Sequence, residues 1–166
     1  MRKVATIALG VVFALSLGGA AAAEEPEFLA VSLGAFDMSD DETSAEARIE
    51  YRSDWRRWLV APMVGLMVNS DGGVYGYGGL YLDVFLGRRV VITPNFAIGG
   101  YAEGAGKDLG SILEFRSGVE IAYRFDNRAR LGVAFQHISN AGIVDTNPGT
   151  ESLVITYAIP LSGPLR

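Results

Sequence analysis

The segment from Ile112 to Phe125 reads ILEFRSGVEIAYRF, and its two alternating sets of residues differ in character. One set is apolar apart from one serine: Leu113, Phe115, Ser117, Val119, Ile121, Tyr123 and Phe125. After its first member, the other set is charged or small: Ile112, Glu114, Arg116, Gly118, Glu120, Ala122 and Arg124. Successive residues of a strand point to opposite faces, so this pattern predicts a strand with one apolar and one polar face. It spans about 14 residues, against about five or six for a typical strand.

Similar long stretches recur along the chain and predict eight strands. They lie near residues 29–37, 43–52, 57–68, 73–86, 89–101, 110–124, 128–139 and 150–160. The breaks after the second, fourth and sixth strands are short and polar, whereas those after the fifth and seventh are longer. An even strand number, short periplasmic turns and longer outer loops are typical of bacterial outer-membrane barrels. We therefore predict an all-β fold, an eight-stranded antiparallel transmembrane β-barrel, in preference to a soluble periplasmic sandwich or a lipocalin-like barrel.

The beginning of the sequence has the features of a secretory signal peptide. A basic start precedes an apolar run from Val4 to Leu17, and small residues follow up to Ala23. This run is shorter than the roughly 20 apolar residues that a transmembrane helix needs. We expect a signal peptide over residues 1–23 and the barrel over residues 24–166.

Composition excludes several classes of function. The 166 residues allow one domain, and the net charge of −5 argues against nucleic acid as a partner. The absence of cysteine excludes disulfides, thiol catalysis and thiolate metal sites, and a single histidine excludes a multi-histidine zinc site. The mean hydropathy of +0.24 is high and points to a membrane.

Two prolines and one pair of strands fit the pattern less well. Pro62 and Pro94 fall inside predicted strands, where each suggests a bulge or a misplaced boundary because proline has no N–H to donate. The predicted strands at 57–68 and 73–86 are apolar on both sides, so their inner and outer faces cannot be assigned from alternation.

Three other features receive a structural interpretation. Trp55 and Trp58 flank a predicted periplasmic turn and suit an aromatic girdle. The glycine-rich run over 72–79 is flanked by strand-like sequence, which favours small residues of a narrow barrel over a phosphate-binding loop. An acidic cluster is expected to form a solvated outer loop rather than a calcium site: Asp37, Asp40, Asp41 and Glu42.

The candidate chemistry lies at the seventh hairpin, in His137, Ser139 and Glu151, here called the polar trio. A serine becomes nucleophilic when a histidine oriented by a carboxylate takes its proton. His137 and Ser139 are two residues apart on one strand and therefore share a face. If Ser139 lies opposite Glu151, then His137 and Glu151 are diagonal neighbours, about 7–8 Å apart.

Alternation also predicts which face carries the polar trio. His137 and Ser139 share parity with Leu131, Val133 and Phe135, whereas Glu151 shares parity with apolar residues of the last strand. The trio therefore belongs to the large apolar face that contacts lipid, where ionisable groups are costly. With the seventh strand running outward, it lies at the outer-leaflet end and can reach only a lipid or lipopolysaccharide substrate.

The longer string around these residues resembles a known family. His-x-Ser-Asn-Ala-Gly over 137–142, followed by Asn-Pro-Gly-x-Glu over 147–151, closely resembles the signature of the PagL family of outer-membrane lipid A 3-O-deacylases. The resemblance implies an eight-stranded barrel that hydrolyses the ester at position 3 of lipid A and releases a 3-hydroxy fatty acid. It implies Ser139 as the nucleophile, His137 as the general base and Glu151 as the residue that orients His137.

Further expectations follow from this resemblance. Asn140, Gly142 and Asn147 are expected to hold the oxyanion or to shape the site, and Phe115 to be an aromatic residue near it. No metal or other cofactor is expected, and a homodimer is implied as a possible assembly. Two alternatives stay open: a non-catalytic small barrel, and another outer-membrane lipid enzyme such as a phospholipase or an acyltransferase.

Overall fold

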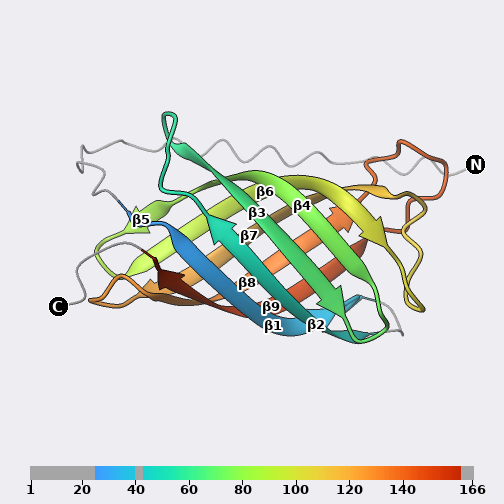
Figure 1. The fold of residues 1–166 in the computed structure, drawn as a ribbon, viewed down its shortest axis with the longest axis horizontal. Helices are drawn as coiled ribbons and strands as arrows, with labels where there is room; N and C mark the ends of the chain where they lie inside the picture. The colour runs from blue at the N-terminus through green and yellow to red at the C-terminus, as the bar shows by residue number, and fades with distance from the viewer. Residues whose placement is uncertain (1–24, 40–42, 162–166) are drawn as a thin grey trace, which may run out of the picture.

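The computed structural model describes residues 25–39 and 43–161, and these form one closed antiparallel sheet (Figure 1). The predicted signal peptide lies outside the described residues. No helix in the described part of the chain is long and apolar enough to cross a membrane.

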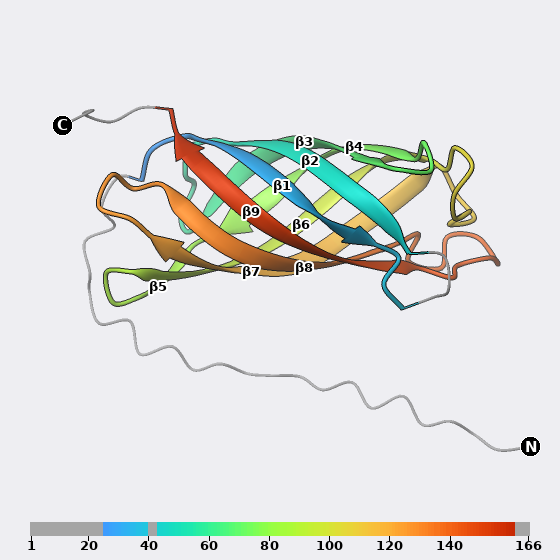
Figure 2. The ribbon, with the colours of Figure 1, turned by 90° about the horizontal axis from the view of Figure 1, so that it is seen from below.

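The sheet contains nine strand segments. Their bounds are β1 Phe28–Phe36, β2 Ser44–Arg52, β3 Val60–Asn69, β4 Val74–Leu82, β5 Val84–Leu86, β6 Val90–Ala102, β7 Leu113–Arg124, β8 Arg130–Ser139 and β9 Thr150–Pro160. Each pairs with its neighbour in the order β4-β3-β2-β1-β9-β8-β7-β6-β5, and pairing of β4 with β6 closes the barrel. Figure 2 shows β9, the last strand, lying beside β1, the first.

The nine segments make eight strands around the barrel, as predicted. β4 and β5 both pair with β6, and the register runs on from Tyr81↔Asn95 to Val84↔Ile92 without an inserted residue. The two segments are therefore one strand, and the predicted strand over 73–86 is confirmed with a break at Asp83. The other predicted strands are also present, with bounds that shift by up to three residues.

The bulge suggested at the two prolines is wrong. The register stays constant past Pro62, which pairs with Leu80, and past Pro94, which pairs with Val119. On its other side Pro94 faces the break between β4 and β5, where a residue without an N–H leaves the ladder interrupted. Pro94 is thus accommodated by a gap in the ladder rather than by an extra residue.

Alternation separates an apolar outer wall from a charged interior. Outward side chains such as Leu33, Ile121 and Ile155 are 63%, 56% and 61% exposed and form the band expected to face lipid. Inward side chains form buried ion pairs that join opposite walls: Arg52 with Glu120 at 2.7 Å, Arg116 with Glu50 at 2.9 Å and Arg130 with Asp83 at 2.9 Å. A buried charge needs a partner, and these pairs fill the lumen.

Tyrosines decide the faces of β3 and β4, which alternation left open. Tyr75, Tyr77 and Tyr81 point inward and are buried. The Tyr77 hydroxyl donates to Glu50 at 2.8 Å, and the Tyr81 hydroxyl donates to the Ser53 carbonyl at 2.8 Å. Tyrosine is apolar along its ring and polar at its tip, so it suits a charged interior as well as an apolar one.

The two ends of the barrel differ. The connections after β1, β3, β6 and β8 lie at one end, here called the site end, where the loops over 103–112 and 140–149 are the long ones (Figure 1). The turns over 53–59, 87–89 and 125–129 lie at the other end, here called the turn end. Trp55 and Trp58 are at the turn end, and both are exposed, as an aromatic girdle requires.

Candidate active site

His137 and Glu151 are direct partners across the β8–β9 ladder. His137 Nδ1 lies 3.0 Å from Glu151 Oε1. The diagonal register assumed from sequence is therefore wrong by two residues, and the real register brings the two side chains closer together. With Nδ1 engaged by the carboxylate, Nε2 is the ring atom left to accept a proton from a neighbour.

Ser139 lies at the end of β8, on the same face as His137. Across the ladder with β7, Ser139 pairs with Phe115 and His137 pairs with Ser117. Within residues 25–39 and 43–161 the Ser139 hydroxyl makes no hydrogen bond, so it is free to rotate toward the imidazole. The structure thus brings all three members of the polar trio to one small area of the wall.

This area is on the outside of the barrel, as parity predicts. The His137 side chain is 42% exposed and that of Glu151 28% exposed, whereas their neighbours Gln136 and Ser152 point inward and are buried. Directly along the same face, Phe135 and Leu153 pair with each other and are both exposed. The polar trio therefore borders the apolar outer band rather than the lumen.

Phe115 adds an aromatic surface beside Ser139. Its ring stacks on that of Phe96 in β6, with centroids 6.1 Å apart. Phe96 is 53% exposed, and Ile98 pairs with Phe115 on the same wall. The expected aromatic residue near the site is present, and it continues into an apolar strip along β6 and β7.

Asn140 organises the loop that follows Ser139. It is fully buried, and its Nδ2 donates to the Leu109 carbonyl at 3.0 Å and to the Thr146 carbonyl at 2.8 Å. Its Oδ1 accepts from the Gly142 N–H at 3.0 Å, where Gly142 has a φ of 76°. Because every polar atom of this amide is engaged, Asn140 and Gly142 shape the loop and join it to the neighbouring loop over 103–112.

Asn147 lies beside the end of β8 that carries Ser139. Its Oδ1 accepts from the Asn140 N–H at 3.1 Å, next to Ser139 in the chain. Its Nδ2 has no hydrogen-bond partner within the described residues, and the residue is exposed. An amide donor is therefore available within this loop, close to Ser139.

Gly149 supports the imidazole from the loop side and has no role assigned from sequence. A Cβ built on it would lie 3.0 Å from His137 Cε1 and 3.6 Å from His137 Nε2, and its φ is 68°. Glycine is the residue that permits both this conformation and this approach. The Asn-Pro-Gly-x-Glu string contains Gly149, but its contact with His137 depends on the register.

Asp37 does not lie in the solvated outer loop that the sequence predicts. It is buried, and its Oδ1 accepts from Lys107 Nζ at 2.7 Å and from the Thr150 hydroxyl at 3.0 Å. The next residue, Met38, donates its N–H to the Glu151 carbonyl at 3.1 Å. Asp37 is therefore part of a brace under Glu151 and not of a solvated loop. The rest of the acidic cluster, residues 40–42, lies outside the described residues.

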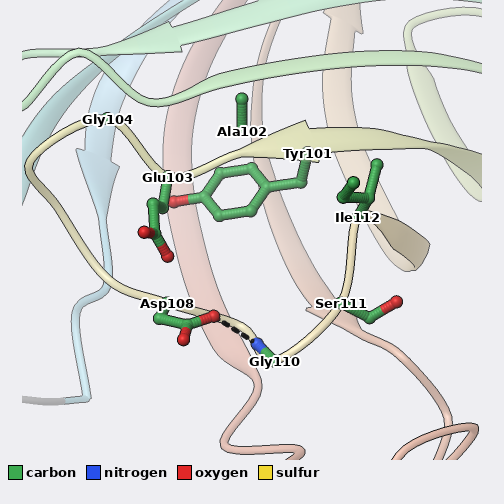
Figure 3. A pocket seen from close by; sticks show the side chains of 8 residues that line it. All are labelled: Tyr101, Ala102, Glu103, Gly104, Asp108, Gly110, Ser111 and Ile112. Carbon is green, nitrogen blue, oxygen red and sulfur yellow. Dashed lines mark hydrogen bonds between the residues drawn. The ribbon is translucent and has the colours of Figure 1, made fainter.

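A hollow of about 510 Å³ lies at the site end, in the loop over 103–112 (Figure 3). Tyr101, Glu103, Asp108 and Ile112 line it, and the Asp108 carboxylate accepts from the Gly110 N–H at 2.7 Å. Gly110 also approaches Thr146, since a Cβ on it would be 2.2 Å from the Thr146 carbonyl oxygen. The hollow is thus next to the loop that carries Asn147.

No group of three or more histidine, cysteine, aspartate or glutamate residues in the described ranges has the geometry to hold a metal ion. The groups that the site itself brings together are an imidazole, a carboxylate, a hydroxyl and an amide.

Comparisons with known proteins identify the family and the fold of this chain. A sequence model described as "Lipid A 3-O-deacylase (PagL)" matches residues 42–160. The chain is 29% identical over 77 residues to a lipid A deacylase PagL of Bordetella bronchiseptica, covering 46% of this chain and 39% of that protein. It is 38% identical over 55 residues to a lipid A deacylase PagL of Pseudomonas aeruginosa, covering 33% of this chain and 32% of that protein.

Solved structures give the same fold. The outer-membrane enzyme PagL superposes with a TM-score of 0.63 at 21% identity, over 81% of this chain and 99% of that one. A designed transmembrane β-barrel superposes with a TM-score of 0.54 at 10% identity, over 81% of this chain and 98% of that one. The sequence matches span about two fifths or less of the two named relatives, whereas the family match covers most of this chain. On that match, the chain belongs to the PagL family.

Proposed function

We propose that this protein is a lipid A 3-O-deacylase of the outer membrane, working as a serine esterase with Ser139 as the nucleophile. The observation that carries the proposal is the 3.0 Å contact between His137 Nδ1 and Glu151 Oε1, with Ser139 on the same strand face. Family membership supports the substrate class, since the family is described as lipid A 3-O-deacylase.

The reaction follows from the roles that these atoms can take. The Ser139 Oγ attacks the carbonyl carbon of the ester, and His137 Nε2 takes the hydroxyl proton. The carbon–oxygen bond to the sugar then breaks, and the imidazolium gives its proton to the departing sugar oxygen. Water then attacks the acyl-serine while the same imidazole takes its proton. The bond between the acyl carbon and Ser139 Oγ breaks, the imidazolium returns the proton to Oγ, and the 3-hydroxy fatty acid leaves. Glu151 fixes the imidazole tautomer and stabilises the imidazolium in both steps.

Asn147 is the residue that we assign to the oxyanion. An acyl transfer needs a donor aimed at the oxygen that becomes negative in the tetrahedral intermediate. The Asn147 side chain is held beside the Asn140 N–H, and its Nδ2 is available. Asn140 and Gly142 are assigned to loop shape, since their polar groups are engaged with each other and with Leu109 and Thr146.

The position on the outer wall suits a substrate that is itself a membrane lipid. Phe115 and Phe96 form an apolar surface beside Ser139 on which an acyl chain can lie. We assign the site end to the outer leaflet, because short turns are typical of the periplasmic side and the long loops are at the site end. The homodimer implied by the resemblance stays a prediction.

Mass spectrometry of lipid A tests the proposal. Lipid A is incubated with refolded protein and, in parallel, with a Ser139→Ala variant whose heat-modifiable mobility and circular dichroism match the wild type. We expect the loss of one 3-hydroxyacyl chain with the wild type only.

Each other outcome contradicts a defined part of the proposal. Unchanged lipid A in both samples favours a non-catalytic barrel. Another lipid enzyme is favoured if lipid A loses a different acyl chain, if it gains an acyl chain, or if only phospholipid is hydrolysed. Loss in both samples removes Ser139 from the mechanism.

A further inference from the structure

The turn over 53–59 lies far from the polar trio and has a feature that the proposed esterase activity does not require. Arg57 and Val60 are joined by two backbone hydrogen bonds, of 3.0 and 3.4 Å, so that Trp58 and Leu59 form the tip of a tight turn. The Trp58 φ is 64°, a left-handed conformation that favours glycine or asparagine and is costly for a bulky residue. The Trp58 side chain is 92% exposed, so no packing within the described residues offsets this cost.

A hollow of about 440 Å³ lies beside this tip. It is lined by Arg57, Trp58, Leu59, Val60 and Leu82. Val60 and Leu82 are direct partners in the β3–β4 ladder, and they belong to the outward rows of those strands. The hollow therefore opens on the lipid-facing wall, at the boundary between the apolar band and the turn end, where a soluble partner cannot reach without displacing lipid.

Arg57 supplies a positive charge at this hollow. The Arg57 side chain is exposed and makes no ion pair or hydrogen bond within the described residues. By contrast, Arg56, its neighbour, points inward and pairs with Asp83 at 2.8 Å. The guanidinium of Arg57 is thus available to a ligand at the level where lipid headgroups lie.

The charges of the two ends favour an anion at the turn end. The three turns there contain more basic than acidic residues: Arg56, Arg57, Arg88, Arg89 and Arg128 against Asp54 and Asp126. Glu25 and Glu27, which precede β1 at the same end, reduce this excess without reversing it. Within the described residues, the connections at the site end are acidic apart from Lys107: Asp37, Asp71, Glu103, Asp108 and Asp145. Arginine near an anionic lipid surface is stabilised, and a guanidinium matches the geometry of a phosphate.

We propose that Arg57, Trp58 and the hollow beside them form a binding site for the headgroup of an anionic phospholipid in the leaflet at the turn end. The phosphate pairs with the Arg57 guanidinium, the Trp58 ring lies at the headgroup level, and the first carbons of an acyl chain contact Val60 and Leu82. The proposal rests on insertion of the barrel in a bilayer and not on the esterase activity.

Tryptophan fluorescence reports directly on this site, because Trp55 and Trp58 are the two tryptophans of the sequence. In a Trp55→Phe background, emission comes from Trp58 alone. The full chain is refolded into phosphatidylcholine vesicles that contain increasing fractions of lipid brominated near the headgroup end of its chains, either phosphatidylglycerol or phosphatidylcholine. Both leaflets have the same composition, so the direction of insertion does not affect the result.

We expect brominated phosphatidylglycerol to quench Trp58 at about a fivefold lower mole fraction than brominated phosphatidylcholine, the factor expected for one arginine at an anionic surface. Arg57→Gln should abolish this preference. Arg88→Gln, an equal change of charge on another turn of the same end, should retain it.

Three results overturn the proposal. The first is equal quenching by the two lipids in the parent protein, and the second is a preference that survives Arg57→Gln. The third is an equal loss of preference in Arg57→Gln and Arg88→Gln, which assigns the effect to overall charge. Since the readout is tryptophan emission, a failed deacylase assay leaves the result interpretable.

Discussion

The Thr150 hydroxyl donates to the buried Asp37 carboxylate at 3.0 Å, although 113 residues separate the two in the sequence. Thr150 directly precedes Glu151, and Lys107 binds the same Asp37 oxygen. These hydrogen bonds hold three segments together under the carboxylate that contacts His137. The segments are the start of the connection after β1, the loop over 103–112 and the start of β9.

Asp37→Asn should weaken this brace and lower the free energy of unfolding by about 1–3 kcal/mol, because the buried acceptor of Lys107 and Thr150 loses its negative charge. Esterase kcat should fall while KM changes little, since Glu151 loses support and the apolar strip is untouched. Urea unfolding in detergent and initial rates measure the two effects. Asp71→Asn, the same change on another site-end turn, is the control. Equal behaviour of the two variants would show that Asp37 has no bracing role.

Glu151→Gln should lower the overall rate of lipid A deacylation by about three to four orders of magnitude. This is the effect of replacing the orienting carboxylate in a serine hydrolase by an amide. The amide retains the shape but no longer stabilises the imidazolium. Rates are measured by release of the 3-hydroxy fatty acid. Glu103→Gln changes a carboxylate in the neighbouring loop and should leave the rate near that of the wild type. A rate for Glu151→Gln within tenfold of wild type contradicts the assigned role.

Gly149→Ala should displace the His137 ring, because the added Cβ would lie 3.0 Å from Cε1. We expect at least a tenfold loss of activity together with a stability cost of about 1 kcal/mol for the positive φ. Gly87→Ala provides the matched control: its φ is 71°, and a Cβ there meets nothing within 4 Å. It should show a similar stability cost and full activity. If both variants keep full activity, the close approach of Gly149 to the imidazole does not contribute to activity.

Asn140→Asp should separate the two long loops at the site end. A carboxylate at this position cannot donate to the Leu109 and Thr146 carbonyls, and it repels them. Trypsin cleavage after Lys107 reports the change, because Lys107 is the basic residue of these two loops. We expect cleavage to become at least several-fold faster than in the wild type. An unchanged cleavage rate in folded Asn140→Asp protein means that the loops are held together by other contacts.

Alternation predicted the faces of most strands because charged and apolar residues differ so clearly along them. In β7 and β8 the parity of the sequence placed His137 on the outer wall, and the structure agrees. Alternation does not distinguish the two faces of β3 and β4, since tyrosine and methionine line the interior there. Tyr77 counts among the apolar residues of the alternating pattern, and its contact with Glu50 reveals a polar role.

The register of the last hairpin could not be derived in the same way. A long connection such as 140–149 does not fix which residues pair, whereas a tight turn does. An error of two residues preserves the faces, so the sequence predicts that the polar trio shares one face but does not give its distances. Asp37 was misplaced for a related reason: its partners Lys107 and Thr150 are far away in sequence, and no local pattern links them.

The polar trio stands on the perimeter of the barrel, with Phe135 and Leu153 continuing the same surface. For the proposed lipid substrate, this position means arrival by diffusion within the plane of the membrane rather than from the aqueous phase. The rate of the proposed reaction is therefore governed by the number of substrate molecules per unit area, and dilution with inert lipid should slow it even when the bulk amount of substrate is constant.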